Sequence, residues 1–293
     1  MEVKASTTRV SAQRIAFVAV VVLFSFMQFF LSPLPYAVLG WFLEPGLVSH
    51  RIHETSFGSI FALSLGGAIA QLRAPERKIA PMYQVVLPIY LTIAAVVLLD
   101  QQFDVVILMF LVIPALLVAL HPARRLLFRP PITRSTVLLA LTVVAALPLA
   151  AFAVAEFRIG QQGSRVAERV EANLPADASL ERFDRALRRA SGSPETLEAA
   201  RHFGHWSAMG AFALSIAAVA GVAAVRIPGW RLCAWSAGAA AVIYGLSSFA
   251  ASSDASAASP PWAALAILWG AAFVVASERE HRSEQPAPAP SVT

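Results

Sequence analysis

Residues 82–120 read MYQVVLPIYLTIAAVVLL, DQQFD and VVILMFLVIPALLVAL, which are two apolar runs separated by five residues. A helix needs about 20 apolar residues, within a range of about 17–25, to cross the hydrocarbon core of a bilayer. The first run, Met82 to Leu99, meets this length, and the second, Val105 to Leu120, comes close to it. This stretch therefore predicts two membrane-spanning helices joined by almost no loop.

Apolar runs of similar length recur along the rest of the chain, at residues 15–31, 55–71, 135–155, 205–225, 232–249 and 262–277. The 293 residues are 57% hydrophobic and 14% charged, with a mean hydropathy of +0.64, whereas soluble domains carry about 25% charged residues. A soluble core of this size could not bury so much apolar surface, but a bilayer solvates it. The sequence predicts an all-α polytopic transmembrane helix bundle of about eight spans, with the lipid bilayer as its partner.

The basic residues predict the orientation of this bundle. With the N-terminus inside, fourteen of the 23 Lys and Arg residues fall in inner segments, and the short outer loops hold only Arg51. Positive charge in short loops marks the cytoplasmic side. We therefore expect a multi-pass protein of the cell membrane with both termini cytoplasmic. Its predicted segments are a cytoplasmic N-terminal segment (1–14), spans one to five (15–155), an extracytoplasmic helical loop (156–204), spans six to eight (205–277) and a disordered cytoplasmic tail (278–293).

The composition also argues against several classes of function. The net charge of +5 comes from loop residues that set topology, and no basic face with interleaved aromatic residues suggests a nucleic-acid partner. The single cysteine, Cys233, cannot form an intrachain disulfide or a cysteine-based metal site. Ionisable residues are absent from the middle of every predicted span, where Gln28 and Gln84 are the main polar residues. Ion-coupled transporters usually carry such groups at the midplane.

The long loop between the fifth and sixth spans shows helical signals. Leu180, Phe183 and Leu187 have the spacing of one stripe on an amphipathic helix, and Ser179 is a candidate N-cap. Ser193-Pro194-Glu195 is a second helix start, with a cap, a proline at the first position and an acid that the helix dipole favours. We expect the stripe to pack on the bundle or the membrane surface, and the second helix to run unbroken into the sixth span.

Four of the six histidines form two pairs with i, i+3 spacing. His50 and His53 precede the second span, and His202 and His205 precede the sixth. The predicted topology places both pairs on the outer face, and i, i+3 spacing puts two rings on one side of a helix. Two imidazoles from each of two helices could converge on one point.

This arrangement makes His50, His53, His202 and His205 candidate metal ligands, because neutral imidazole is the commonest metal ligand. Glu54 and Glu198 lie beside the pairs and could orient the histidines or bind the ion themselves. Further carboxylates predicted at the same face are Asp100, Asp104, Glu156 and Asp254. The set suits zinc, copper, iron or a haem, and does not choose among them.

Two other interpretations of the histidines are open. They could form a hydrogen-bonded polar cluster without an ion, or they could be unrelated interfacial residues, since histidine suits a membrane boundary. Three functions follow. The first is an outward-facing His/carboxylate site for redox or hydrolytic chemistry or metal handling. The second is a transporter or receptor for a lipid-like molecule, which needs no midplane charge. The third is a structural or partner-binding membrane subunit. The sequence does not decide whether the protein is an enzyme, and names no catalytic residue or protein partner.

Overall fold

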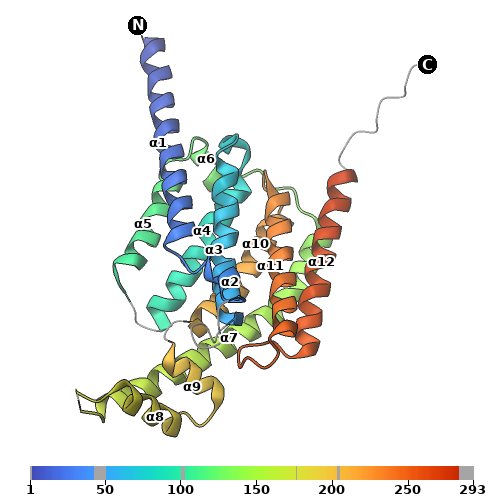
Figure 1. Cartoon of the computed structure of the whole chain (residues 1–293). Coiled ribbons are helices and arrows are strands. Elements are labelled where there is room, and N and C mark those ends of the chain that lie inside the picture. The colour runs from blue at the N-terminus through green and yellow to red at the C-terminus, as the bar shows by residue number, and fades with distance from the viewer. Residues whose placement is uncertain (1, 43–50, 100–102, 176, 203–204, 284–293) are drawn as a thin grey trace.

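The computed structural model describes residues 2–42, 51–99, 103–175, 177–202 and 205–283 (Figure 1). These residues form helices and no β-strand, which confirms the predicted all-α class. The helices are α1 (Glu2–Phe30), α2 (Tyr36–Leu39), α3 (Arg51–Gln71), the short 3₁₀-helix η1 (Pro75–Arg77), α4 (Ile79–Leu99), α5 (Val105–Leu120), α6 (Arg124–Phe128), α7 (Thr136–Ala172), α8 (Leu180–Ala190), α9 (Pro194–Arg201), α10 (His205–Ala224), α11 (Trp230–Ala250) and α12 (Pro260–Ser283).

Six of these helices are long and apolar enough to cross a membrane, namely α1, α4, α7, α10, α11 and α12, and they indicate a multi-pass membrane protein. Helix α5 is apolar but has only 16 residues, about 24 Å of helix. Helix α3 has 21 residues but is not among the candidate spans. All eight predicted runs are helical, yet the predicted count of about eight spans is not confirmed.

The lower hydropathy of α3 follows from its place in the bundle. This helix packs against α1, α2, α4, α10 and α11, and most of its residues are buried, including Thr55, Ser56 and Ser64. A central helix meets protein and not lipid, so it does not need an apolar side chain on every face. Helix α10 is the other central helix, with contacts to α3, α4, α7 and α11.

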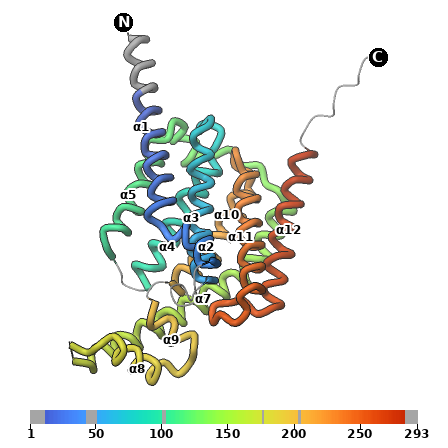
Figure 2. The backbone as a smooth tube through the Cα atoms, in the orientation of Figure 1, coloured from blue at the N-terminus to red at the C-terminus, as the bar shows by residue number. Residues whose placement is uncertain are grey.

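The bundle has two distinct ends, as the tube in Figure 2 shows. Helix α1 begins and α12 ends at the same end, while α8, α9 and the second half of α7 project at the other (Figure 1). We call the latter the α9 end. Helices α3 and α10 both begin there, so the residues at their starts are brought to one side of the protein.

A three-helix unit forms at the α9 end from the second half of α7 together with α8 and α9. Val166, Val170 and Leu187 are buried in its own small apolar cluster, and Phe183 packs against them. Leu180 is 88% exposed. The predicted stripe therefore packs at two of its three positions, against α7 and α9 and not against the main bundle.

The predicted helix starts in this unit are correct. The Ser179 hydroxyl accepts a hydrogen bond from the backbone N–H of Arg182, and the Ser193 hydroxyl accepts one from that of Thr196. The prediction that the second helix runs unbroken into the sixth span is wrong. Helix α9 ends at Arg201, because His202 leaves the helical conformation with φ −126° and ψ 78°, and α10 begins at His205.

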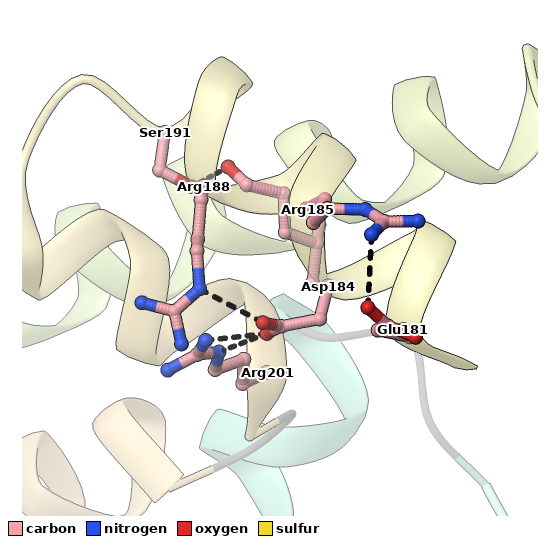
Figure 3. Close-up of polar contacts among 7 residues, drawn as sticks. Glu181, Asp184, Arg185, Arg188, Ser191 and Arg201 are labelled. Atoms are coloured by element: carbon pink, nitrogen blue, oxygen red, sulfur yellow. Dashed lines mark hydrogen bonds and ion pairs between the residues drawn. The ribbon is translucent and has the colours of Figure 1, made fainter.

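Ion pairs join α8 to α9 on the surface of this unit (Figure 3). Asp184 accepts hydrogen bonds from Arg188 at 2.8 Å and from the Nε of Arg201 at 2.8 Å. These hydrogen bonds hold the pKa of the Asp184 carboxyl below its usual range. Arg201 is thereby directed toward α8 and lies immediately before the histidine at the helix break.

His121 forms a separate polar contact at the opposite end of the bundle. Its Nδ1 accepts a hydrogen bond from the Ala123 N–H at 3.1 Å, so Nε2 carries the proton and donates to Gln71 Oε1 at 3.2 Å. The Gln71 amide donates in turn to the Lys78 carbonyl at 2.9 Å. Burial lowers the pKa of His121 from 6.5 to about 4. This histidine is a structural element of the fold, far from the α9 end.

Candidate functional site

The start of α3 and the start of α10 bring three of the four candidate histidines together at the α9 end. His53 lies in the first turn of α3, His205 is the first residue of α10, and His202 caps the C-terminus of α9. His50 lies outside the described residues. The convergence that was predicted from topology and spacing is therefore found for His53, His202 and His205.

The rings of these histidines are close. The centroids of His53 and His205 are 5.8 Å apart, and the rings of His202 and His205 stack with centroids 5.5 Å apart. His53 is almost fully buried, and its ring packs against that of Trp206 in a T-shaped arrangement with centroids 4.9 Å apart. His202 and His205 are half-buried. The cluster thus runs from an enclosed position at His53 to a partly open one at His205.

A carboxylate faces His53 from α9, since Glu198 Oε2 lies 3.9 Å from His53 Nε2. This separation allows electrostatic attraction to a protonated imidazole but exceeds the length of a hydrogen bond. Glu198 reaches His53 from α9, which is separated from α3 along the chain by η1 and helices α4 to α8, so the three-helix unit contributes directly to the cluster. Glu54 lies next to His53 on α3 and lines a pocket together with His205.

The predicted metal site finds no support in this arrangement. Within the described ranges, no three His, Cys, Asp or Glu side chains are placed so that they could hold a metal ion. The stacked rings of His202 and His205 face each other, whereas a shared ion requires ring nitrogens that point to one position. Metal binding by His53, His202 and His205, with Glu54 and Glu198 beside them, remains a prediction.

Two adjoining pockets meet at His205. The first, which we call the α4–α5 pocket, has a volume of about 300 Å³. It is lined by Leu31, Pro33, Phe57, Phe61, Ile89, Thr92, Ile93, Val96, Asp104, Val106, Ile107, Phe110 and His205. The second, the α2 pocket, has a volume of about 380 Å³ and is lined by Phe30, Leu31, Ser32, Pro33, Tyr36, Glu54, Phe57 and His205. Because both include Leu31, Pro33, Phe57 and His205, they form one continuous region beside the histidine cluster.

The polarity of this region changes along the helix axes. On α3, Glu54 comes first from the α9 end, and Phe57 and Phe61 follow at successive turns. On the α5 side, Asp104 caps the helix and Phe110 lies deeper. Among the described lining residues, the deep part has one polar side chain, Thr92, whose hydroxyl donates to the Pro88 carbonyl at 2.8 Å. The region therefore has a polar end at the histidines and an apolar end within the bundle.

The other carboxylates that were predicted at this face have different positions. Asp104 lines the α4–α5 pocket with His205, while its side chain also accepts a hydrogen bond from the Ile107 N–H. Asp100 lies outside the described residues. Glu156 is buried along α7, one turn before Gly160, which faces Trp206 and Ser207. Asp254 is half-buried in the turn between α11 and α12. Of these four residues, Asp104 alone lines a described pocket together with a candidate histidine.

Sequence reasoning did not assign a site role to Phe57 or to Trp206. Phe57 lies one helical turn after His53, and its ring is 6.3 Å from that of His205. Trp206 directly follows His205 and is buried against His53. The i, i+4 spacing of His53 and Phe57 is a signal that the sequence does contain. The pocket itself leaves no such signal, because its lining comes from five segments that only the fold brings together.

Comparison of the chain with protein-family models, with curated proteins and with solved structures finds no match. The function proposed below therefore rests on the histidine cluster and the two pockets beside it.

Proposed function

We propose that this protein binds a lipid-like small molecule at the α9 end of its bundle, as a transporter or a receptor. The polar end of the ligand lies at Glu54 and His205, beside the buried His53, and its apolar part occupies the α4–α5 pocket. The observation that carries this proposal is the change in polarity along the lining of one continuous region. The lining is polar at Glu54 and His205 and apolar at Phe61 and Ile89. Ligand sites are typically apolar concavities of about 300–1,000 Å³ with a few polar groups that fix orientation.

The position of the polar end supports a ligand that enters from the bilayer. Phe57, Ile93 and Phe110 lie on helices beside the polar cluster, so a chain could follow the helix axes while its head group stays near the membrane boundary. Such a ligand does not require an ionisable group at the midplane. Gln28 and Gln84, the polar residues in the middle of the bundle, are buried and donate to Ser64 and to the Leu63 carbonyl. They serve packing between helices.

The orientation belongs to the same proposal. Both termini lie in the cytoplasm and the α9 end faces outward in the cell membrane, which is the orientation that the basic loops favour. Residues 156–204 then form an extracytoplasmic insertion that covers the polar end. The ligand would enter from the outer leaflet.

Extraction of bound lipids from detergent-purified protein tests the proposal. We expect mass spectrometry to find an amphiphile in near-stoichiometric amount with the wild-type protein, and much less of it with Ile107→Trp, which fills the α4–α5 pocket from α5. Leu98→Trp places the same indole on a lipid-exposed position of α4 and should leave the bound amount unchanged. Equal amounts of the same lipids in all three samples would mean that only annular lipid was extracted, and would rule the proposal out.

A further inference from the structure

We infer that the ligand of the α4–α5 and α2 pockets carries a positively charged amine as its head group, on a single apolar chain. The assignment of the head group rests on the proposed function, and it comes from the charges that line the polar end.

Two carboxylates line this region at the level of the histidines. Asp104 contributes to the α4–α5 pocket and Glu54 to the α2 pocket, and His205 belongs to both. A third carboxylate, that of Glu198, lies 3.9 Å from the ring of His53 behind them. Because each pocket is lined by His205 and by one of these carboxylates, a small group that enters either pocket meets a carboxylate as well as the ring.

Permanent positive charge is not found in the same lining. Of the described residues that line the two pockets, none is a lysine or an arginine. The two arginines nearest in sequence are engaged elsewhere. The Arg51 guanidinium lies over the Trp41 ring at 5.8 Å, and Arg201 donates to Asp184. A phosphate or carboxylate head group would therefore meet like charge without an arginine or lysine partner.

A primary ammonium group fits the chemistry of this end. It donates charge-assisted hydrogen bonds to carboxylate oxygens, which are about twice as strong as bonds between neutral groups. Phe57 and Tyr36 add aromatic surface within the same lining, and the faces of such rings attract cations. The chain attached to the amine would extend past Phe61 and Ile89, where the lining is apolar.

Three probes with one chain and different head groups test this assignment, namely dodecylamine, dodecanol and dodecanoate. Binding to the full-length protein is measured in nanodiscs of phosphatidylcholine, as the shift in melting temperature with probe concentration. The pocket variants Ile107→Trp and Ile93→Trp are measured in the same way, each on its own. Their shift in melting temperature reports partition of the probe into the bilayer and is subtracted from that of the wild-type protein. We expect dodecylamine to bind at least about tenfold more tightly than the other two, the ratio that about 1.4 kcal/mol of charge-assisted contact produces.

The double variant Glu54→Gln, Asp104→Asn should remove most of this preference and leave binding of dodecanol within about twofold. Asparagine retains the helix cap that Asp104 supplies to α5, so loss of folding is not the expected result. Glu168→Gln, Glu171→Gln removes the same charge from exposed positions of α7 and should keep the preference for the amine. A preference that persists in the first double variant would overturn the assignment.

Two further results distinguish a failure of the amine assignment from a failure of the proposed function. If dodecanol or dodecanoate binds as tightly as dodecylamine, and both pocket variants abolish that binding, the proposed function stands and the amine assignment is wrong. If the wild-type protein binds no probe more strongly than the pocket variants do, the proposed function is wrong, and the head-group assignment that rests on it is wrong as well.

Discussion

The imidazole rings of His53 and His205 lie with their centroids 5.8 Å apart, although one belongs to the start of α3 and the other to the start of α10. His53 is buried between this ring and Trp206. Each histidine therefore contributes to the environment of the other, and neither can be replaced without a change at its neighbour.

We expect His53→Ala and His205→Ala to be non-additive in stability. Residues in contact show coupling energies of about 0.5–3 kcal/mol, so the double variant should cost less than the sum of the two single variants in the free energy of unfolding. Denaturant titration in detergent measures the cycle. His53→Ala combined with His281→Ala, on the last turn of α12, is the additive control. Additivity in the first pair would show that the two rings are independent, and coupling that grows with added zinc would support the metal prediction.

The proposed orientation predicts from which side of the membrane a reagent can reach the three-helix unit. Arg165 is exposed on the second half of α7. In a background with buried Cys233 replaced by alanine, Arg165→Cys should react with an impermeant thiol reagent added to intact cells. Arg125→Cys, in the loop that is predicted to be cytoplasmic, should react only after permeabilisation. The reverse pattern would invert the topology and place the polar end of the pocket inside the cell.

The three-helix unit should depend on Leu187. This side chain is buried against α7, and full burial of a leucine is worth roughly 1.5–3 kcal/mol, so Leu187→Asp should lower the melting temperature. Leu180→Asp makes the same exchange on the same helix at an exposed position and should leave the melting temperature nearly unchanged. Equal effects of the two variants would contradict the packing of α8 on α7.

His121 should make stability depend on pH below neutrality. Its pKa is lowered by burial to about 4 in the folded state, against 6.5 for the free side chain. Between these values the unfolded state binds a proton that the folded state does not, so stability falls as the pH falls from 6.5 toward 4. His121→Gln should flatten this part of the curve of melting temperature against pH. An unchanged slope would mean that His121 does not control this part of the curve.

Glu156 should be a destabilising residue. It is buried along α7, and its Oε2 has no hydrogen-bond partner among the described residues. A buried polar atom left without a partner costs about 1–3 kcal/mol, so Glu156→Met should raise the free energy of unfolding by that order. Glu168→Met, at an exposed position of the same helix, should change it little. A less stable Glu156→Met variant would reveal a stabilising partner for this carboxylate.

The apolar runs by themselves determined that the chain is a bundle of membrane helices. The run Val105 to Leu120 coincides with α5. The other runs lie within α3, α4, α11 and α12, or agree with α1, α7 and α10 to within one residue at one end. This agreement has a local cause, because a chain in lipid must satisfy its backbone hydrogen bonds within each segment. Ser179 and Ser193 were likewise visible as helix starts, since capping involves only neighbouring residues.

The tertiary structure alone decided which of these residues form a site. The i, i+3 spacing placed the histidines at one end of the bundle, but only the packing of α3 against α10 sets His53 beside His205. The break at His202, the burial of Glu156 and the pocket that links Asp104 to His205 depend on contacts between distant segments. Such contacts depend on how side chains fit across helices, which a periodic pattern in one segment does not specify.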